Sequence, residues 1–356
     1  MNRDPILFRV DASAGVGYER LTRCLTYASA LQRRRRPTFF LSQLEPRSLG
    51  QAIKRTGSEW LEADAEAGSR ADLEEAIQEI RRLQPAAMII DSAGVSENYL
   101  QRLAATGVCL VSLDHLGTIK LPSQLVVNPL LGPSKEAYEY GPLTQLLLGA
   151  RYALVRSEIR RARPARSQEP PAPFCGLIGL GDDDPNLKVG ELARVLMNVA
   201  KVERVDVAVR AEHPQMEALQ ALAAANPDRL KIAVELGEIA ARLPRCHFAI
   251  TAGNAFALEL ACVGLPQLVI VQAEAYWPTA QRLEEEGAAS CLGWHESVSA
   301  ATIRQAVQNL LGDPLERQAM SRCGRQLIDA RGNDRLVTAL EVVLHPSRLI
   351  HLAEAA

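Results

Sequence analysis

The most constraining feature of this 356-residue chain is a regular alternation of short apolar runs with longer helical patterns. In the first part of the chain, apolar runs of strand length occupy residues 6–10, 38–41, 87–90 and 108–113, and helical patterns occupy 19–32, 69–83 and 96–105. Strands separated by helices pair in parallel, because each helix carries the chain back across the sheet before the next strand begins. The alternation therefore predicts an α/β fold with a doubly wound parallel sheet.

The alternation begins a second time after residues 160–173, RRARPARSQEPPAP, a segment rich in proline and charge. Further strands are predicted at 174–180, 205–209, 230–234, 248–250 and 266–271, with helices at 187–200, 239–243, 256–263, 278–286, 300–311, 314–328 and 333–344. We predict an N-terminal Rossmann-like domain over 1–156, a linker over 157–173 and a C-terminal Rossmann-like domain over 174–356. The last helix would end the second domain or pack back on the first. Residues 126–128 and 146–149 are expected to form a short strand and a loop.

Composition excludes several classes of function. The net charge of −2 gives no basic field that would recruit nucleic acid or a membrane surface. No signal peptide precedes the first strand, and no apolar run is long enough to span a bilayer. The seven cysteines form no C-x-x-C pair, and Cys109 and Cys262 lie in apolar runs, so we expect buried free thiols in a reducing cytoplasm. The oligomeric state stays open, with a monomer favoured.

Polar residues follow the predicted strands of the first half. Asp11 follows the first strand, Asp91 follows 87–90, and Asp114 and His115 follow 108–113. The carboxyl ends of parallel strands line the ligand crevice of open α/β sheets. We therefore expect these side chains at the rim of an active site in the cleft between the two halves.

The loop after the first strand contains Gly15-Val-Gly17 but is not a dinucleotide fingerprint. Its third glycine is missing, and Glu19 and Arg20 occupy the place where a pyrophosphate would approach. A nicotinamide cofactor is excluded on this ground, and no other cofactor is expected.

The stretch from Cys246 to Pro266 predicts a phosphate site in the second half. A buried strand is followed by a turn of small residues that includes Gly253, Asn254 and Ala255, and then by a helix. Such a turn frees backbone N–H groups to face an anion, with the helix dipole behind them. Glu259, on the first turns of that helix, would accept both hydroxyls of a ribose, or else be a solvated carboxylate. No carboxylate pair accompanies the turn, so no metal ion is expected.

A series of degenerate motifs follows in order along nearly the whole chain. They are Phe8-Arg-Val-Asp11-x-Ser13-x-x-x-Gly17 with Arg23, Ile90-Asp91 with Gly94, Ser112-Leu-Asp114, Asn128, Gly149 with Tyr152-Ala-Leu-x-Arg156, Gly181 with Asp183, Glu259 with Gly264-Leu-Pro266, and Asp329-x-x-Gly332-x-x-Arg335. Together they resemble the two-domain GT-B architecture of the MurG-like superfamily. Within it, the chain is most similar to the UDP-sugar hydrolases of pseudaminic acid biosynthesis and their spore-coat polysaccharide relatives.

This resemblance implies an enzyme that processes a UDP-sugar in surface polysaccharide or nonulosonic-acid biosynthesis. The nucleotide would be held by the second domain, at the turn of residues 253–255 with Glu259, Gly181 and Asp183. The sugar would lie towards Gly17, Asp91, Asp114 and Asn128. Water as acceptor would make the protein a hydrolase, and a sugar or lipid hydroxyl would make it a glycosyltransferase.

The chain departs from the family at the first loop, where the family has Gly-x-Gly-His and this sequence has Gly17-Tyr18-Glu19-Arg20. The family's histidine is thought to activate water. Arg20 cannot replace it as a base, because a guanidinium stays protonated and has no acceptor. His115 and Asp11 are the candidate bases, and Arg20 would bind a phosphate or a substrate carboxylate, or form a salt bridge with Glu19 or Asp11.

The alternatives remain open at this stage. His115 would otherwise be a rim residue without a catalytic part. The whole chain would otherwise be an inactive shell that binds a nucleotide-sugar. The family's Gly-Gly pair in the second domain is here Leu180-Gly181, and its Asn-Gln pair is Ala275-Tyr276.

Overall fold

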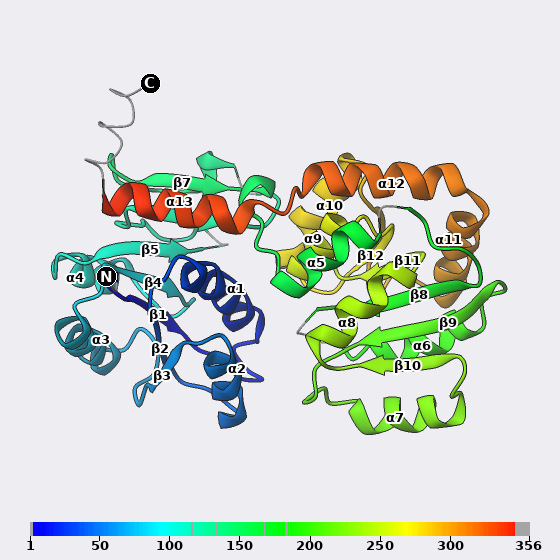
Figure 1. Cartoon of the computed structure of the whole chain (residues 1–356), viewed down its shortest axis with the longest axis horizontal. Coiled ribbons are helices and arrows are strands. Elements are labelled where there is room, and N and C mark those ends of the chain that lie inside the picture. The colour runs from blue at the N-terminus through cyan, green and yellow to red at the C-terminus, as the bar shows by residue number, and fades with distance from the viewer. Residues whose placement is uncertain are drawn as a thin grey trace. The chain divides into compact units, whose positions relative to one another are not determined.

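The computed structural model describes residues 3–114, 117–132, 134–166, 168–181, 184 and 186–345. These residues form two compact units (Figure 1). Unit 1 comprises the described residues up to 129, from 134 to 154 and from 331 onward, and unit 2 comprises 130–132 and 155–330. Each unit has its own parallel sheet, so the predicted α/β class with two doubly wound sheets is confirmed.

Unit 1 contains a seven-stranded sheet in the order β3-β2-β1-β4-β5-β6-β7. Its strands are β1 (Ile6–Val10), β2 (Thr38–Ser42), β3 (Glu59–Glu62), β4 (Ala87–Asp91), β5 (Cys109–Leu113), β6 (Leu125–Asn128) and β7 (Gln145–Leu148), and its helices are α1 (Glu19–Arg33), α2 (Gly50–Arg55), α3 (Arg70–Leu83), α4 (Glu97–Ala104) and α13 (Gly332–Leu344). Strand order reverses on either side of β1, as expected for a doubly wound sheet.

Alternate side chains of β1 enter two separate cores, because successive residues of a strand point to opposite faces. Phe8 packs with Tyr27 of α1 and Phe40 of β2 on one face. Leu7 packs with Leu73 of α3 and Leu100 of α4 on the other. Both faces of the central strands are therefore covered, which explains why those strands are continuous apolar runs.

The last helix, α13, is part of unit 1. Figure 1 shows it on the same side of the sheet as α1, against which it packs. Leu336 and Leu340 are fully buried in the core of that face, and the Tyr27 hydroxyl donates to the Leu336 carbonyl at 3.1 Å. Arg36 donates to Glu341 from Nε at 2.9 Å. Helices α1 and α13, which are far apart in the sequence, thus contribute to the same core.

Unit 2 contains a six-stranded sheet in the order β10-β9-β8-β11-β12-β13. Its strands are β8 (Phe174–Gly179), β9 (Val202–Ala208), β10 (Leu230–Ala233), β11 (Phe248–Thr251), β12 (Gln267–Val271) and β13 (Ser290–Trp294), and its helices are α5 (Ser157–Ala165), α6 (Val189–Met197), α7 (Met216–Ala225), α8 (Leu236–Arg242), α9 (Ala255–Val263), α10 (Trp277–Glu285), α11 (Ala300–Gly312) and α12 (Pro314–Leu327). Helix α9 is buried from Phe256 to Val263, between the sheet and the helices α5 and α12.

Several edge elements differ from the sequence-based prediction. Residues 146–149 were expected to form a loop, but Gln145–Leu148 form strand β7, and β3 and β13 were not predicted. Both β3 and β13 are outermost strands with half-buried or exposed residues, so they lack the apolar run that marks a central strand. Residues 157–165 of the predicted linker form α5, because Ile159 and Ala162, three residues apart, supply a buried stripe against unit 2.

No helix in the described part of the chain is long and apolar enough to cross a membrane.

We predict that α13 contributes directly to the stability of unit 1. Leu340→Ala should lower the free energy of local opening of β1 and β4 by about 2 to 5 kcal/mol, because it opens a cavity in the shared core. Native-state amide hydrogen exchange on these strands measures the change. Thr338→Ala, at an exposed position of the same helix, is the matched control and should change it by less than about 0.5 kcal/mol. Unchanged protection in Leu340→Ala would contradict a structural role for the helix.

Candidate functional site

Asp11 lies directly after β1 and is held by two hydrogen bonds. Its Oδ1 accepts from Arg9 Nη1 and, at 2.7 Å, from the backbone N–H of Gln43. Arg9 is fully buried in β1 and also donates from Nε to Asp72 of α3 at 2.7 Å. Burial by itself would lower the pKa of Arg9, but the hydrogen bonds and charges of Asp11 and Asp72 raise it above its ordinary value. Both bonds to Asp11 use Oδ1, so Oδ2 is the oxygen that remains to meet a ligand.

Asp91, the last residue of β4, is an acceptor for Arg23. The Arg23 guanidinium donates to both carboxylate oxygens in a bidentate pair, and both side chains are at least nine-tenths buried. Arg20 lies one helical turn earlier on α1, with its Nε 3.8 Å from Asp91 Oδ1 and its side chain 28% exposed. Asp91 therefore aligns two arginines of α1, and Arg20 is the one that reaches solvent.

Asp114 and Asn128 lie at the ends of the next two strands. Asp114 Oδ2 accepts from the N–H of Gly117 at 2.7 Å. Asn128 is fully buried and donates to the Tyr138 hydroxyl at 2.8 Å, and that hydroxyl donates to the Asp114 carbonyl at 3.2 Å. Asn128 thus fixes the loop that carries Tyr138, a residue that the sequence did not single out because it belongs to no strand or motif.

The candidate residues of unit 1 form a row along one edge of the sheet. The strands β1, β4, β5 and β6 are neighbours, and Val10 pairs with Asp91 across the first two of them. Gly17 closes the loop after β1 by donating its N–H to the Ser13 carbonyl at 2.8 Å, and its φ of 86° is one that glycine adopts without strain. His115 lies outside the described residues.

A pocket of about 120 Å³ lies at the corresponding carboxyl edge of unit 2. We call it the carboxyl-edge pocket; it is lined by Arg156, Gly181, Ala208, Val209, Arg210, Val234, Leu236, Ile239 and Phe256. Gly181 follows β8, residues 208–210 end β9, and Val234 follows β10. Seven of these nine residues are apolar or glycine, and the other two are arginines. Its volume suits a single ring, so a larger ligand would extend beyond it.

The turn predicted as a phosphate site is tightly packed. Gly253 has a φ of 81° and lies against Ala280, so a side chain there would be strained and would collide. Asn254 is fully buried and donates to the Leu180 carbonyl at 2.7 Å, which fastens the turn to the end of β8 beside Gly181. Its Oδ1 is buried without a hydrogen-bond partner among the described residues. Ala255 is half-buried, and Asp183 lies outside the described residues.

Glu259 is buried and bound to Arg156. Its carboxylate accepts from the Arg156 backbone N–H at 2.7 Å and from Nε at 2.9 to 3.0 Å, and it is 4% exposed. The alternative of a solvated carboxylate is therefore wrong. Arg156 also lies over the Phe256 ring, with its Cζ 5.5 Å from the ring centroid. In this arrangement Glu259 holds Arg156 at the pocket, and direct contact of Glu259 with a ribose would require Arg156 to be displaced.

Sequence reasoning included Arg156 in a motif but gave it no role. The signal for a role was present: an arginine at the start of α5 and a glutamate in an otherwise apolar helix are each costly to bury alone. Which of the many arginines pairs with Glu259 depends on the packing of α5 against α9, and the sequence does not reveal that contact.

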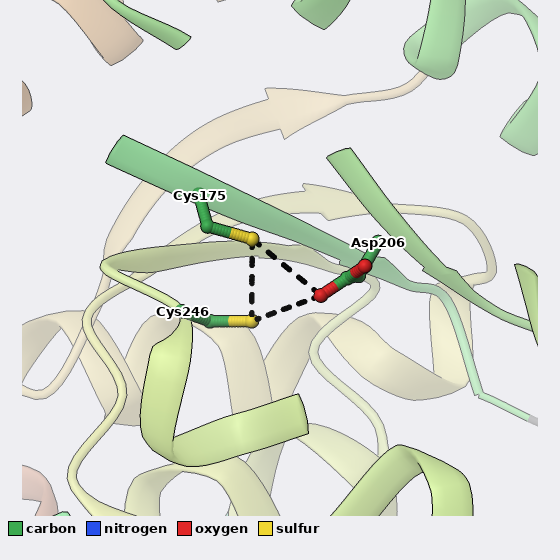
Figure 2. Close-up of side chains that lie close together, drawn as sticks. All are labelled: Cys175, Asp206 and Cys246. Atoms are coloured by element: carbon green, nitrogen blue, oxygen red, sulfur yellow. Dashed lines mark hydrogen bonds between the residues drawn. The ribbon is translucent and has the colours of Figure 1, made fainter. Parts of the chain in front are cut away.

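One group of side chains has the composition of a metal site. Figure 2 shows Cys175, Asp206 and Cys246, all buried in unit 2, with the two sulfurs 3.9 Å apart and Asp206 Oδ2 3.5 and 3.9 Å from them. Both Asp206 oxygens already accept from arginines, Arg204 at 3.1 Å and Arg242 at 3.0 Å. The hydrogen bond with Cys175 and burial both raise the pKa of the Cys246 thiol. We therefore interpret the group as hydrogen-bonded thiols in the core. The expectation that the site uses no metal stays a prediction.

Comparison with known sequences finds a distant homologue. No protein-family profile matches the chain. The spore coat polysaccharide biosynthesis protein SpsG of Bacillus subtilis (strain 168) is 23% identical over 221 residues, which cover 62% of this chain and 65% of SpsG. The chain thus matches just under two thirds of the length of that relative.

Comparison with solved structures identifies the fold. MurG of Acinetobacter baumannii superposes with a TM-score of 0.63 at 14% identity, covering 95% of this chain and 99% of MurG. The spinosyn rhamnosyltransferase SpnG, solved with thymidine diphosphate, superposes with a TM-score of 0.65 at 17% identity, covering 95% of this chain and all of SpnG. The fold is GT-B-like. At these identities the likeness establishes the fold and leaves the activity to be argued from the site.

Proposed function

We propose that this protein is a nucleotide-sugar enzyme that binds a UDP-sugar through unit 2 and cleaves it at the anomeric carbon, in the synthesis of a surface polysaccharide or a nonulosonic acid. The observation that carries the proposal is the carboxyl-edge pocket, which lies where ligands bind in open parallel sheets. The similarity to SpsG, a spore coat polysaccharide biosynthesis protein, supports the pathway, and the diphosphate bound to SpnG supports the ligand class.

The pocket combines two kinds of surface that a nucleoside diphosphate requires. Val209, Val234 and Ile239 give apolar walls for a base. Arg156 and Arg210 supply guanidinium groups for phosphate oxygens, which arginine binds in a bidentate manner. Arg156 is fixed by Glu259, so its cation is already oriented before the ligand arrives.

The reaction depends on which group activates the acceptor. Arg20 cannot do so, because a guanidinium has no acceptor, and the Oδ1 of Asp11 is already bonded to Arg9. His115 is the remaining candidate, with water as acceptor in a hydrolase and a hydroxyl in a glycosyltransferase.

The second candidate function is an inactive shell that binds a nucleotide-sugar without turnover. The observation that favours it is the position of Arg20 beside Asp91, because this pair leaves a cation where the family has its histidine. The two functions differ in turnover and agree in nucleotide binding.

We predict that Arg156→Ala weakens UDP binding at least about tenfold, because it removes a charge-assisted hydrogen bond to phosphate. Isothermal titration calorimetry with UDP measures the change. Arg161→Ala, on the exposed face of α5, is the matched control and should bind UDP as the parent does. Because Arg156→Ala leaves Glu259 without its buried partner, Phe256→Leu provides a second variant that alters the pocket while keeping an apolar side chain. UDP binding that is unchanged in both variants would refute the pocket assignment.

A comparison of UDP with 2′-deoxy-UDP separates two roles of Glu259. If Glu259 acts by holding Arg156, Glu259→Gln should weaken both ligands by a similar factor, since the loss lies at the phosphate. This is the result that we expect from the hydrogen bonds to Arg156. If Glu259 instead binds the ribose, the parent should prefer UDP over the deoxy ligand and Glu259→Gln should lose that preference.

We predict that Arg20→His creates or raises hydrolysis of the UDP-sugar of pseudaminic acid biosynthesis, by about a hundredfold or more over Arg20→Gln. The assay is the release of UDP. A base must be neutral to accept a proton, so activity should fall on the acid side, and the nearby Asp91 should move that midpoint upward by favouring the imidazolium. Equal, background rates in both variants would favour the inactive shell.

A further inference from the structure

A second pocket lies at the opposite, amino-terminal edge of the unit 2 sheet. We call it the amino-edge pocket; its volume is about 440 Å³ and its polar lining includes Arg166, Glu169, Arg317, Gln318, Ser321 and Arg322. Pro266, which also lines it, precedes β12, and Arg317 lies over the ring of Phe174, the first residue of β8. The pocket is therefore separated from the carboxyl-edge pocket by the length of the strands.

Arg166 is the unusual member of this pocket. The residue is only 2% exposed, and its Nε has no hydrogen-bond partner among the residues that the structure describes. Burial lowers its pKa to about 10, so the guanidinium is still charged at neutral pH. A buried guanidinium N–H without an acceptor is costly, and ionisable groups with shifted pKa values cluster at binding and catalytic sites.

The acid that lines the same pocket is already engaged. Glu169 Oε1 accepts from Arg317 Nε, and Arg317 also donates to the Leu310 carbonyl at 2.6 Å. This pair holds Arg317 in place on α12. The charge of Glu169 also raises the pKa of Arg166, but burial lowers that pKa by more.

The balance of charge in the pocket is positive. Three guanidinium groups, those of Arg166, Arg317 and Arg322, face one carboxylate, that of Glu169. The hydroxyl of Ser321 and the amide of Gln318 add neutral hydrogen-bonding groups beside them. Several guanidiniums with a hydroxyl form the donor set that proteins use for phosphate oxygens.

We propose that the amino-edge pocket binds the phosphate group of a small phosphorylated metabolite, with Arg166 as its main ligand. A free phosphate ion would fill only part of the volume, so the organic remainder would lie against Gln318 and Pro266. This site is independent of the proposed UDP-sugar site, because it uses none of the residues at the carboxyl edge. Its occupancy would neutralise the buried charge and stabilise unit 2.

The test compares Arg166→Met with the parent protein in phosphate-free buffer and in the presence of inorganic phosphate. Methionine fills a similar volume without charge, so we expect Arg166→Met to melt at the same temperature as the parent or higher when phosphate is absent. Titration calorimetry should show phosphate binding to the parent and at least about tenfold weaker binding to the variant. Arg304→Met, on α11 and outside the pocket, is the matched control and should bind phosphate as the parent does.

Two further measurements distinguish the amino-edge pocket from the carboxyl-edge pocket and identify the class of ligand. Arg156→Ala should retain the part of the phosphate response that Arg166→Met loses, which distinguishes failure here from failure of the UDP assignment. A sugar phosphate that binds more tightly than inorganic phosphate identifies an organic ligand, and equal affinity identifies free phosphate; either supports the oxyanion site. Absence of phosphate binding to the parent, equal binding to Arg166→Met, or a lower melting temperature of Arg166→Met in phosphate-free buffer would each overturn the proposal.

Discussion

Burial of carboxylates, one at the end of a strand and one inside a helix, is the constraint on which the rest of this structure depends. A carboxylate removed from water must be paired, and a guanidinium is the side chain best suited to pair with it. Asp91 is paired with Arg23, and Glu259 is paired with Arg156. Each pair joins different elements, α1 with β4 and the start of α5 with α9. The same interactions that make burial tolerable therefore set the positions of the side chains that line each sheet edge.

The central architecture could be predicted because the sequences of the buried strands are mainly apolar. Residues 6–10 and 87–91 are buried at every position, and the alternation of such runs with helices leaves one plausible class of sheet. The edge strands could not be predicted, because a strand such as Glu59–Glu62 has a neighbour on one side only and is partly solvated. Whether a strand can be predicted from its sequence therefore depends on its position in the sheet, central or edge, as well as on the strand propensity of its residues.

In the candidate site, too, some features could be predicted from the sequence and others could not. Asp11 and Asp114 follow their strands directly and Asp91 is the last residue of its strand, so their places at the sheet edge follow from topology. The identity of their hydrogen-bond partners does not follow from topology. Arg9 reaches Asp72 across a separation of 63 residues, and Arg156 reaches Glu259 across 103. These pairings depend on how helices pack, and no local pattern encodes them. The ribose-binding role expected for Glu259 illustrates the limit: the residue was singled out, and its hydrogen-bond partner was not.

The membership of α13 in unit 1 has a consequence for how this protein is made. Unit 1 draws its strands from the beginning of the chain but takes its covering helix from residues 332–344, after all of 155–330 has been synthesised. At ordinary translation rates the ribosome needs roughly 10 to 35 s for that interval. During this time the apolar surface around Tyr27 is not yet covered by α13. Unit 2 is continuous in sequence apart from residues 130–132, so all of its strands have been synthesised by the end of the interval. The order of completion is thus the reverse of the order of synthesis, and the nascent N-terminal half is the part of this protein that a chaperone would need to shield.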